Sequence, residues 1–233
     1  MVRQNYQYFV AEMSVNDMAG MQEAIKSVED YVREAVQHYE SGHGWSHIER
    51  VVRLATHIHD CEVKGDRDTV VLGALLHDIG DHKFALHDGP AEIRRILGSL
   101  GIDQGIVEEV VSINENISFS KGQSDRLKSP ELQIVQDADR LDAMGAIGIA
   151  RAFSYGGFKG REIYDPRQGF VNPPGFADSK NSASTVHHFY DKLLVLKNLM
   201  NTPTGRKMAD ERHDFMVRYL EQFFSEWNSG NEY

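Results

Sequence analysis

Apolar residues recur every three or four positions through most of the chain, the spacing that places them on one face of an α-helix. Residues 21–39, 46–58 and 102–117 each follow this pattern, and Ser46 is expected to cap the second segment. Residues 68–79 are apolar on every side, which predicts a central helix that is buried all round. No segment alternates convincingly with a period of two, so β-strands are not expected.

Proline and capping residues predict where several further helices begin. Pro90 suits the first turn of a helix that Gly101 would end. Ser129-Pro130 and Thr202-Pro203 are each expected to open a helix, and the last of these would run through Trp227. Residues 186–200 carry another amphipathic stripe. These signals together predict an all-α fold, a single helical bundle.

The segment from residue 156 to residue 184 concentrates glycine and proline, and it predicts a long irregular loop near the functional site. The rest of the chain divides into two expected parts. Residues 1–20 form an N-terminal extension, and residues 21–233 form one helical domain. Within that domain the motif core covers about residues 44–145 and the C-terminal helices cover residues 184–228.

Composition narrows the class of protein. The chain has 233 residues, of which 41% are hydrophobic, and a formal net charge of −10. An acidic surface disfavours a nucleic-acid polymer, although a metal ion can still attract a small anionic substrate. The single cysteine, Cys61, indicates a reducing compartment, so a cytoplasmic location is expected. Membrane attachment is not expected, because no stretch is long and apolar enough to cross a bilayer and residues 1–20 lack a signal-peptide pattern.

The strongest local signal is the pair His77-Asp78 at the end of the buried helix. An imidazole combined with carboxylates suits a divalent ion such as manganese, nickel, iron or magnesium. Asp81 follows Asp78 by three residues and would project to the same side of a continuing helix. Asp81 is therefore the candidate to orient an attacking water molecule or to accept its proton.

Two further groups could complete a metal cage. His47 lies early in its expected helix, and Asp139 lies in a run with two other carboxylates. Three carboxylates in six residues of an apolar helix are costly to bury unless a cation neutralises them. Asp137 or Asp142 could take the place of Asp139, because the sequence alone does not separate them.

The order His47, His77-Asp78 and Asp139 resembles the HD superfamily of metal-dependent phosphohydrolases. Segments 44–47, 76–81, 117–122, 136–143 and 188–194 are similar to those of its small YpgQ-like pyrophosphohydrolase branch, over about residues 44–227. This resemblance implies an all-helical HD domain in which His47, His77, Asp78 and Asp139 bind the ion. Only His82 and His87 stand where two-metal relatives carry extra ligands, so one divalent ion is expected, with Mn²⁺ first and Ni²⁺, Fe²⁺, Co²⁺ or Mg²⁺ as alternatives.

The resemblance also implies a function, hydrolysis of a nucleoside triphosphate to a monophosphate and pyrophosphate. A 5′-nucleotidase or other small phosphomonoesterase remains an alternative, as does a regulatory module that binds a nucleotide without turnover. The oligomeric state is left open, with a homodimer among the options. Cations near the motifs are the candidates for substrate contact: Arg50, Lys83, Lys121 and Arg140.

Overall fold

The computed structural model describes residues 2–37, 44–80, 88–117, 128–167 and 184–229, with side chains from residue 19 onward. Within these ranges the chain is helical and contains no strand, and one isolated bridge joins Glu162 to Ser184. The prediction of an all-α fold is therefore confirmed. The helices are α1 (Val2–Ala35), α2 (Trp45–Glu62), α3 (Arg67–Leu76), α4 (Gly89–Ser99), α5 (Gln104–Asn116), α6 (Pro130–Asp142), α7 (Gly145–Phe158), α8 (Thr185–Asp191) and α9 (Pro203–Asn228), with a 3₁₀-helix at Leu193–Leu199.

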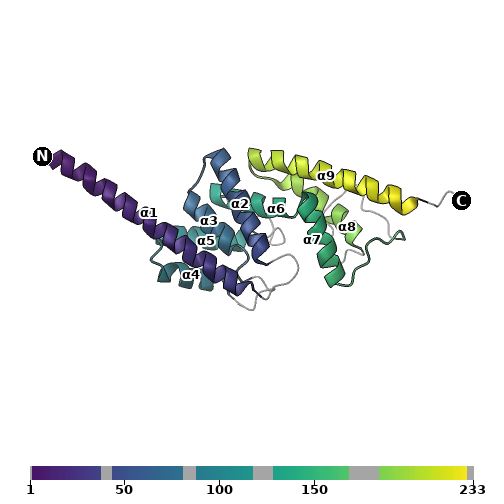
Figure 1. The fold of residues 1–233 in the computed structure, drawn as a ribbon, viewed down its shortest axis with the longest axis horizontal. Coiled ribbons are helices and arrows are strands. Elements are labelled where there is room, and N and C mark those ends of the chain that lie inside the picture. The colour runs from purple at the N-terminus through teal and green to yellow at the C-terminus, as the bar shows by residue number, and fades with distance from the viewer. Residues whose placement is uncertain (1, 38–43, 81–87, 118–127, 168–183, 230–233) are drawn as a thin grey trace.

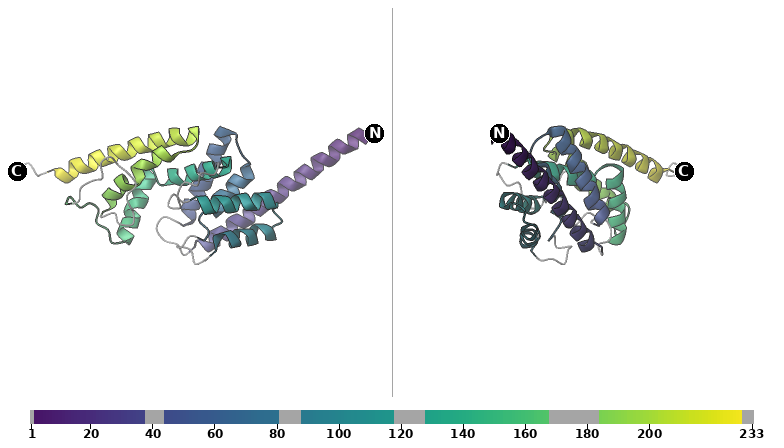
Figure 2. Two further views of the ribbon diagram at one scale, coloured as in Figure 1. Left: turned by 180° about the vertical axis from the view of Figure 1, so that it is seen from behind. Right: turned by 60° about the vertical axis from the view of Figure 1, so that its left-hand side comes forward.

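Helix α3 lies at the centre of the bundle, where α1, α2, α5 and α6 all pack against it (Figure 1). Its residues Thr69–Leu76 are all buried, as the apolar sequence predicts. Helix α4 covers α5 on one side, whereas α7, α8 and α9 gather on the other side of α6 (Figure 2). The N-terminal part of α1 projects past the other helices in both figures.

Local capping signals placed several helix starts correctly. The Ser129 hydroxyl accepts a hydrogen bond from the Leu132 amide, and the Thr202 hydroxyl accepts one from Gly205, each with a proline in the first turn. Helix α2 differs, because it begins at Trp45 with Gly44 as its N-cap and without a side-chain cap. The expectation of Ser46 as the cap is therefore wrong.

Two segments differ from the sequence prediction. Residues 186–200 do not form one helix, because α8 ends at Asp191 and a 3₁₀-helix follows. Helix α7 was not predicted, and it contains Gly156 and Gly157, which the sequence assigned to the loop. Residues 168–183 of that expected loop lie outside the described residues.

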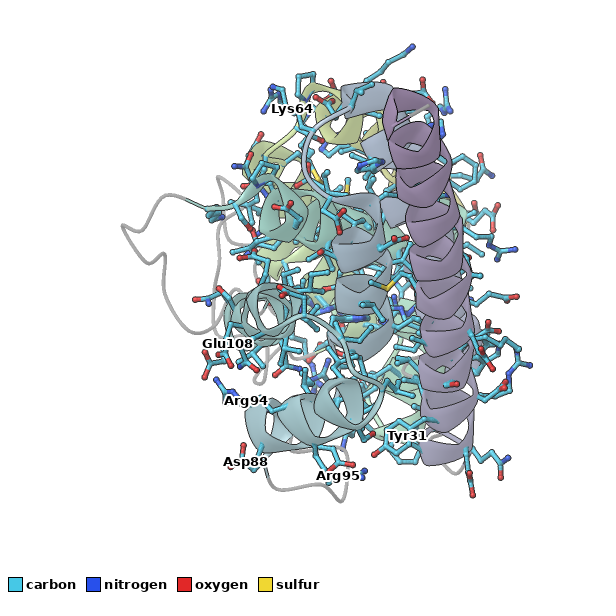
Figure 3. The ribbon with its side chains drawn as sticks, turned by 90° about the vertical axis from the view of Figure 1, so that its left-hand side faces the viewer. Tyr31, Lys64, Asp88, Arg94, Arg95 and Glu108 are labelled. Carbon is cyan, nitrogen blue, oxygen red and sulfur yellow. The ribbon has the colours of Figure 1, made fainter. Side chains whose placement is uncertain are left out.

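The C-terminal half of α1 is fastened to α4 by a polar cluster (Figure 3). The Tyr31 hydroxyl donates to Glu92 over 2.6 Å, and the Arg95 guanidinium donates twice to the same carboxylate. Burial and the bond to Glu92 raise the pKa of Tyr31 to about 12. The Arg95 hydrogen bonds lower the pKa of Glu92 to about 2, against a smaller opposing effect of burial.

None of the helices in the described part of the chain combines the length and the apolar character that a membrane span requires.

Candidate metal centre

Three helices bring the four predicted metal ligands together. His47 lies in the first turn of α2, His77 caps the C-terminus of α3, Asp78 follows it, and Asp139 lies on α6. The His47 Nε2 atom is 3.6 Å from a carboxylate oxygen of Asp78 and 3.6 Å from one of Asp139. The His77 Nε2 atom is 3.5 Å and 3.9 Å from the same two carboxylates. Both imidazoles therefore direct one nitrogen at the same pair of carboxylates.

The opposite nitrogen of each histidine is held by a hydrogen bond. The His77 Nδ1 atom lies 2.8 Å from the Ala74 carbonyl, an acceptor, so this nitrogen carries the proton. The His47 Nδ1 atom lies 2.7 Å from a carboxylate oxygen of Asp142. With both Nδ1 atoms acting as donors, each neutral imidazole directs its Nε2 lone pair at the carboxylates, which is the arrangement that metal-binding histidines require.

The contacts at these nitrogens fit a cation. His77 Nε2 is buried and has no hydrogen-bond partner in the described part of the chain, which is costly for a polar atom unless a ligand satisfies it. Ligand atoms of His47, His77 and Asp78 lie within 4.8 Å of one another. Two imidazoles with carboxylates and no thiolate suit a borderline or hard divalent ion.

The electrostatics of His47 point the same way. Burial lowers the pKa of His47, but hydrogen bonds to Asp142 and Asp78 and the charge of Asp139 outweigh burial and raise it to about 9. The carboxylates therefore stabilise a positive charge at this position, which a proton or a metal ion can supply.

A close backbone contact shapes the turn that carries His77 and Asp78. Helix α3 ends at Leu76, and Gly80 adopts a left-handed conformation with φ of 82°. A Cβ atom at Gly80 would lie 2.3 Å from the Gly89 backbone at the start of α4. Because helical geometry does not continue through Gly80, the spacing argument that placed Asp81 beside Asp78 loses its basis.

The other two carboxylates of α6 have different partners. Asp137 is fully buried and accepts hydrogen bonds from the backbone amides and side chains of Asn201 and Thr202, ahead of α9. Asp142 holds His47 Nδ1, on the side of the ring away from the ligand cluster. Among the three carboxylates that the sequence left open, Asp139 lies beside the Nε2 atoms.

Two of the residues predicted to contact the substrate, Arg50 and Arg140, form hydrogen bonds within the protein. Arg50 donates to both carboxylate oxygens of Asp142, over 2.6 and 3.0 Å. Arg140 is buried, and its guanidinium donates to the Leu199 carbonyl. Their roles in binding substrate stay predictions. So do those of the residues that lie outside the described part of the chain: Asp81, Lys83 and Lys121.

Sequence reasoning missed Arg151 altogether. Its guanidinium donates to Asp142 over 2.5 Å, and its charge acts on His47. Arg151 lies on α7, which the sequence did not predict, so no periodicity placed it near the ligands. The only available signal was a basic residue nine positions after Asp142, the last carboxylate of the run.

Comparison with known proteins identifies the family. The chain is 36% identical over 202 residues to YpgQ of Bacillus subtilis, covering 84% of this chain and 90% of that protein, and residues 44–144 match the HD domain. This chain belongs to the HD family of metal-dependent phosphohydrolases. The prediction of family and enzyme class is thereby confirmed.

Solved HD structures resemble this one over nearly their whole length. A crystal structure of a HD-superfamily hydrolase from Bacillus thuringiensis has a TM-score of 0.73 at 37% identity, covering 90% of this chain and 99% of that one. The structure of Bacillus subtilis YpgQ in complex with ADP has a TM-score of 0.71 at 34% identity, covering 89% and 96%. The HD fold of this chain is thus shared with close structural relatives.

Proposed function

We propose that this HD protein hydrolyses nucleoside triphosphates to a monophosphate and pyrophosphate. One divalent ion, with Mn²⁺ as the first choice, would be held by His47, His77, Asp78 and Asp139. The observation that carries the proposal is the convergence of two oriented histidine nitrogens on two carboxylates within 3.9 Å. A catalytic ion of this kind supplies Lewis acidity that activates water and polarises a phosphoryl oxygen.

The protein's own groups would do the remaining work. Asp142 and the Ala74 carbonyl keep the two imidazoles oriented through their Nδ1 atoms. Asp81 is proposed to orient the attacking water or to accept its proton. Hydrolysis adds the water's oxygen to phosphorus and breaks a phosphoanhydride bond. The negative charge that develops would be balanced by cations, for which we propose Arg50, Lys83, Lys121 and Arg140.

The choice of a nucleotide substrate has support from one relative. Bacillus subtilis YpgQ was crystallised in complex with ADP, and it shares 34% of its residues with this chain. A 5′-nucleotidase or another phosphomonoesterase would use the same ion and ligands. A regulatory nucleotide-binding module is less favoured, because such a module would be expected to lose a ligand and this chain has all four.

The test is a turnover assay on metal-stripped protein with Mn²⁺ added back. Nucleoside mono-, di- and triphosphates would be supplied separately, and phosphate and pyrophosphate would be quantified as distinct products. Pyrophosphate from triphosphates, abolished in Asp78→Asn, is the expected result. Asp214→Asn is the matched control. The Asp214 side chain is 70% exposed, so this substitution should leave turnover unchanged.

Other outcomes would redirect the assignment. Phosphate released from monophosphates alone would identify a phosphomonoesterase. Binding of Mn²⁺ and nucleotide without turnover, across several metals, would identify a regulatory module.

A further inference from the structure

The C-terminal turn of α6 carries two carboxylates at an electrostatically unfavourable place. Asp139 lies in the last turn of the helix, and Asp142 is its final residue. The last carbonyls of a helix lack partners within it and give this end a partial negative charge, so a carboxylate there is unfavourable. A positively charged donor that reaches these carbonyls would therefore help to hold both carboxylates in place.

Arg212 of α9 is such a donor. Its guanidinium donates to the Leu141 carbonyl, which lies 71 residues away in the sequence and in the last turn of α6. The aliphatic part of the side chain crosses the turn that follows α6, because a Cβ atom at Gly145 would lie 3.1 Å from the Arg212 Cγ atom. Burial lowers the pKa of Arg212, and the charge of Asp142 acts in the opposite direction. Arg212 therefore interacts with the Asp142 charge as well as with the carbonyl.

The bond to Leu141 acts on Asp142 through a rigid unit. The carbonyl of Leu141 and the Cα atom of Asp142 belong to one planar peptide group. Fixing the carbonyl therefore fixes the point from which the Asp142 side chain starts. That side chain is 2% exposed, and its carboxylate lies 2.7 Å from the Nδ1 atom of His47. A short path thus leads from Arg212, through the peptide group and the Asp142 carboxylate, to a predicted metal ligand.

Helix α6 is also held to the C-terminal segment by its own side chains. Asp137 accepts hydrogen bonds from the backbone amides of Asn201 and Thr202, just before α9. Arg212 differs, because it bonds to the backbone of α6 itself. All of these partners lie outside residues 44–144, which match the HD domain. The helix that carries Asp139 is therefore positioned in part by a segment beyond the matched domain.

We propose that Arg212 is a positioning residue for the metal centre, which fixes Asp142 and through it the orientation of His47. The inference rests on the proposed function only in so far as His47 binds the divalent ion. It does not depend on which substrate is hydrolysed. Arg212 acts through other residues and touches neither the ion nor the substrate, so its effect should appear in metal affinity.

The test is Mn²⁺ affinity, measured calorimetrically on metal-free protein without nucleotide. Arg212→Met keeps most of the aliphatic chain and removes the donor, so Mn²⁺ affinity should fall about tenfold, the lower end of the range for groups that orient metal ligands. An effect of charge alone would have the opposite sign, because removing a nearby cation favours a bound cation. Arg212→Lys, which keeps the charge without the guanidinium, should lie between Arg212→Met and the wild type.

Arg206 provides a matched control on the same helix. Its guanidinium also donates to backbone carbonyls, those of Met200 and Asn201, but these belong to the segment before α9. Arg206→Met should leave Mn²⁺ affinity unchanged, whatever its effect on the melting temperature.

A double-mutant cycle tests the route through Asp142. Asp142→Asn keeps all four predicted ligands and should weaken Mn²⁺ binding about 10- to 100-fold. If Arg212 acts through Asp142, adding Arg212→Met to that variant should have little further effect. Losses that add in full would show that Arg212 does not act by this route, and they would overturn the inference.

Other outcomes would overturn it as well. Unchanged or higher Mn²⁺ affinity in Arg212→Met, at any melting temperature, would make Arg212 a structural cap of α6. If Arg212→Met does not fold, wild-type Mn²⁺ affinity in Arg212→Lys would have the same meaning. An equal loss of affinity in Arg206→Met would show a general effect of lower stability.

The same measurements separate this inference from the proposed function. Failure of the wild type to bind Mn²⁺ would overturn both. Mn²⁺ binding that depends on Arg212, in a protein that turns over no nucleotide, would refute the proposed function and leave this inference standing.

Discussion

The side-chain amide of Asn114 lies 3.0 Å from the backbone carbonyl of His77 and donates a hydrogen bond to it. The same amide nitrogen lies 3.0 Å from the Leu76 carbonyl and 2.8 Å from that of Ile79. The last carbonyls of a helix have no partners within the helix. Asn114 of α5 therefore closes the end of α3 at the point where the predicted metal ligands begin.

Replacing Asn114 with alanine should loosen this turn. The partly buried carbonyls would lose their shared donor, so we expect the free energy of unfolding to fall by about 1–3 kcal/mol. Mn²⁺ binding should weaken too, because His77 and Asp78 would be less well positioned. Urea unfolding and calorimetric titration measure the two effects. Asn116→Ala is the control, because its exposed side-chain amide donates to the Ser112 carbonyl of its own helix. A similar loss of stability in both variants would contradict the prediction.

Gly80 offers a second test of the same turn, with a matched glycine elsewhere. Gly80 and Gly101 both have positive φ, 82° and 70°, but a Cβ atom at Gly101 meets nothing within 4 Å among the described residues. Gly101→Ala should cost about 1–2 kcal/mol from backbone strain alone. Gly80→Ala should cost more, because its Cβ would also strike the Gly89 backbone. Equal losses in thermal stability would show that the close contact is unimportant.

The Glu92 cluster predicts a change of stability with pH. The pKa of Glu92 is lowered to about 2 in the folded protein, from an ordinary value of 4.5, chiefly by Arg95. Its stabilising effect is therefore full above about pH 4.5 and is lost as the pH falls from there towards 2. Wild-type protein should be more stable than Glu92→Gln near neutral pH, and the gap should close below pH 4.5. Urea unfolding at a series of pH values would measure this, and a gap independent of pH would contradict it.

Asp137 should contribute strongly to the stability of the fold and should not affect metal binding. In Asp137→Asn, a side-chain NH₂ group would face the backbone amides of Asn201 and Thr202, which are also donors, in a fully buried position. We therefore expect the free energy of unfolding, measured by urea denaturation, to fall by about 3–5 kcal/mol. Mn²⁺ affinity of the folded protein should not change. Asp210→Asn is the control, because that carboxylate is 67% exposed and pairs with Lys197 at 3.7 Å. Weaker Mn²⁺ binding in Asp137→Asn would argue against Asp139 as the α6 ligand.

Local signals predicted the parts of the fold that depend on neighbouring residues. The starts of α6 and α9 were correct, because a capping hydroxyl followed by proline acts within one helical turn. The buried helix α3 was correct because its composition is apolar on all sides. The cap of α2 was wrong, since Gly44 caps through its backbone conformation and leaves no side-chain signal.

Long-range contacts explain what the sequence did not predict. In α7, a Cβ at Gly148 would lie 2.3 Å from the Ala143 carbonyl oxygen, and one at Gly156 would lie 2.1 Å from the Thr185 hydroxyl. These glycines permit close packing, but glycine has a low helix propensity, so the sequence of α7 only weakly predicts a helix. Its neighbours, distant in sequence in the case of Thr185, decide the conformation.

Contacts between residues far apart in the sequence also decide the geometry of the candidate site. The sequence predicted a ligand set by residue type and order, but it left Asp137 and Asp142 as alternatives to Asp139. The partners that distinguish them, His47 for Asp142 and Asn201 for Asp137, are 95 and 64 residues away. Helical spacing alone carries no information about such contacts.

The two histidines of the centre are oriented by acceptors of different kinds, a backbone carbonyl for His77 and a side chain for His47. Every amino acid at position 74 offers a carbonyl, so substitution there leaves the acceptor of His77 in place. The acceptor of His47 is a side chain, so a substitution at position 142 can remove it and change the negative charge beside the imidazole. Natural variation or engineering can therefore adjust the electron-donating strength of one predicted ligand, His47, while the backbone keeps the acceptor of the other, His77, unchanged.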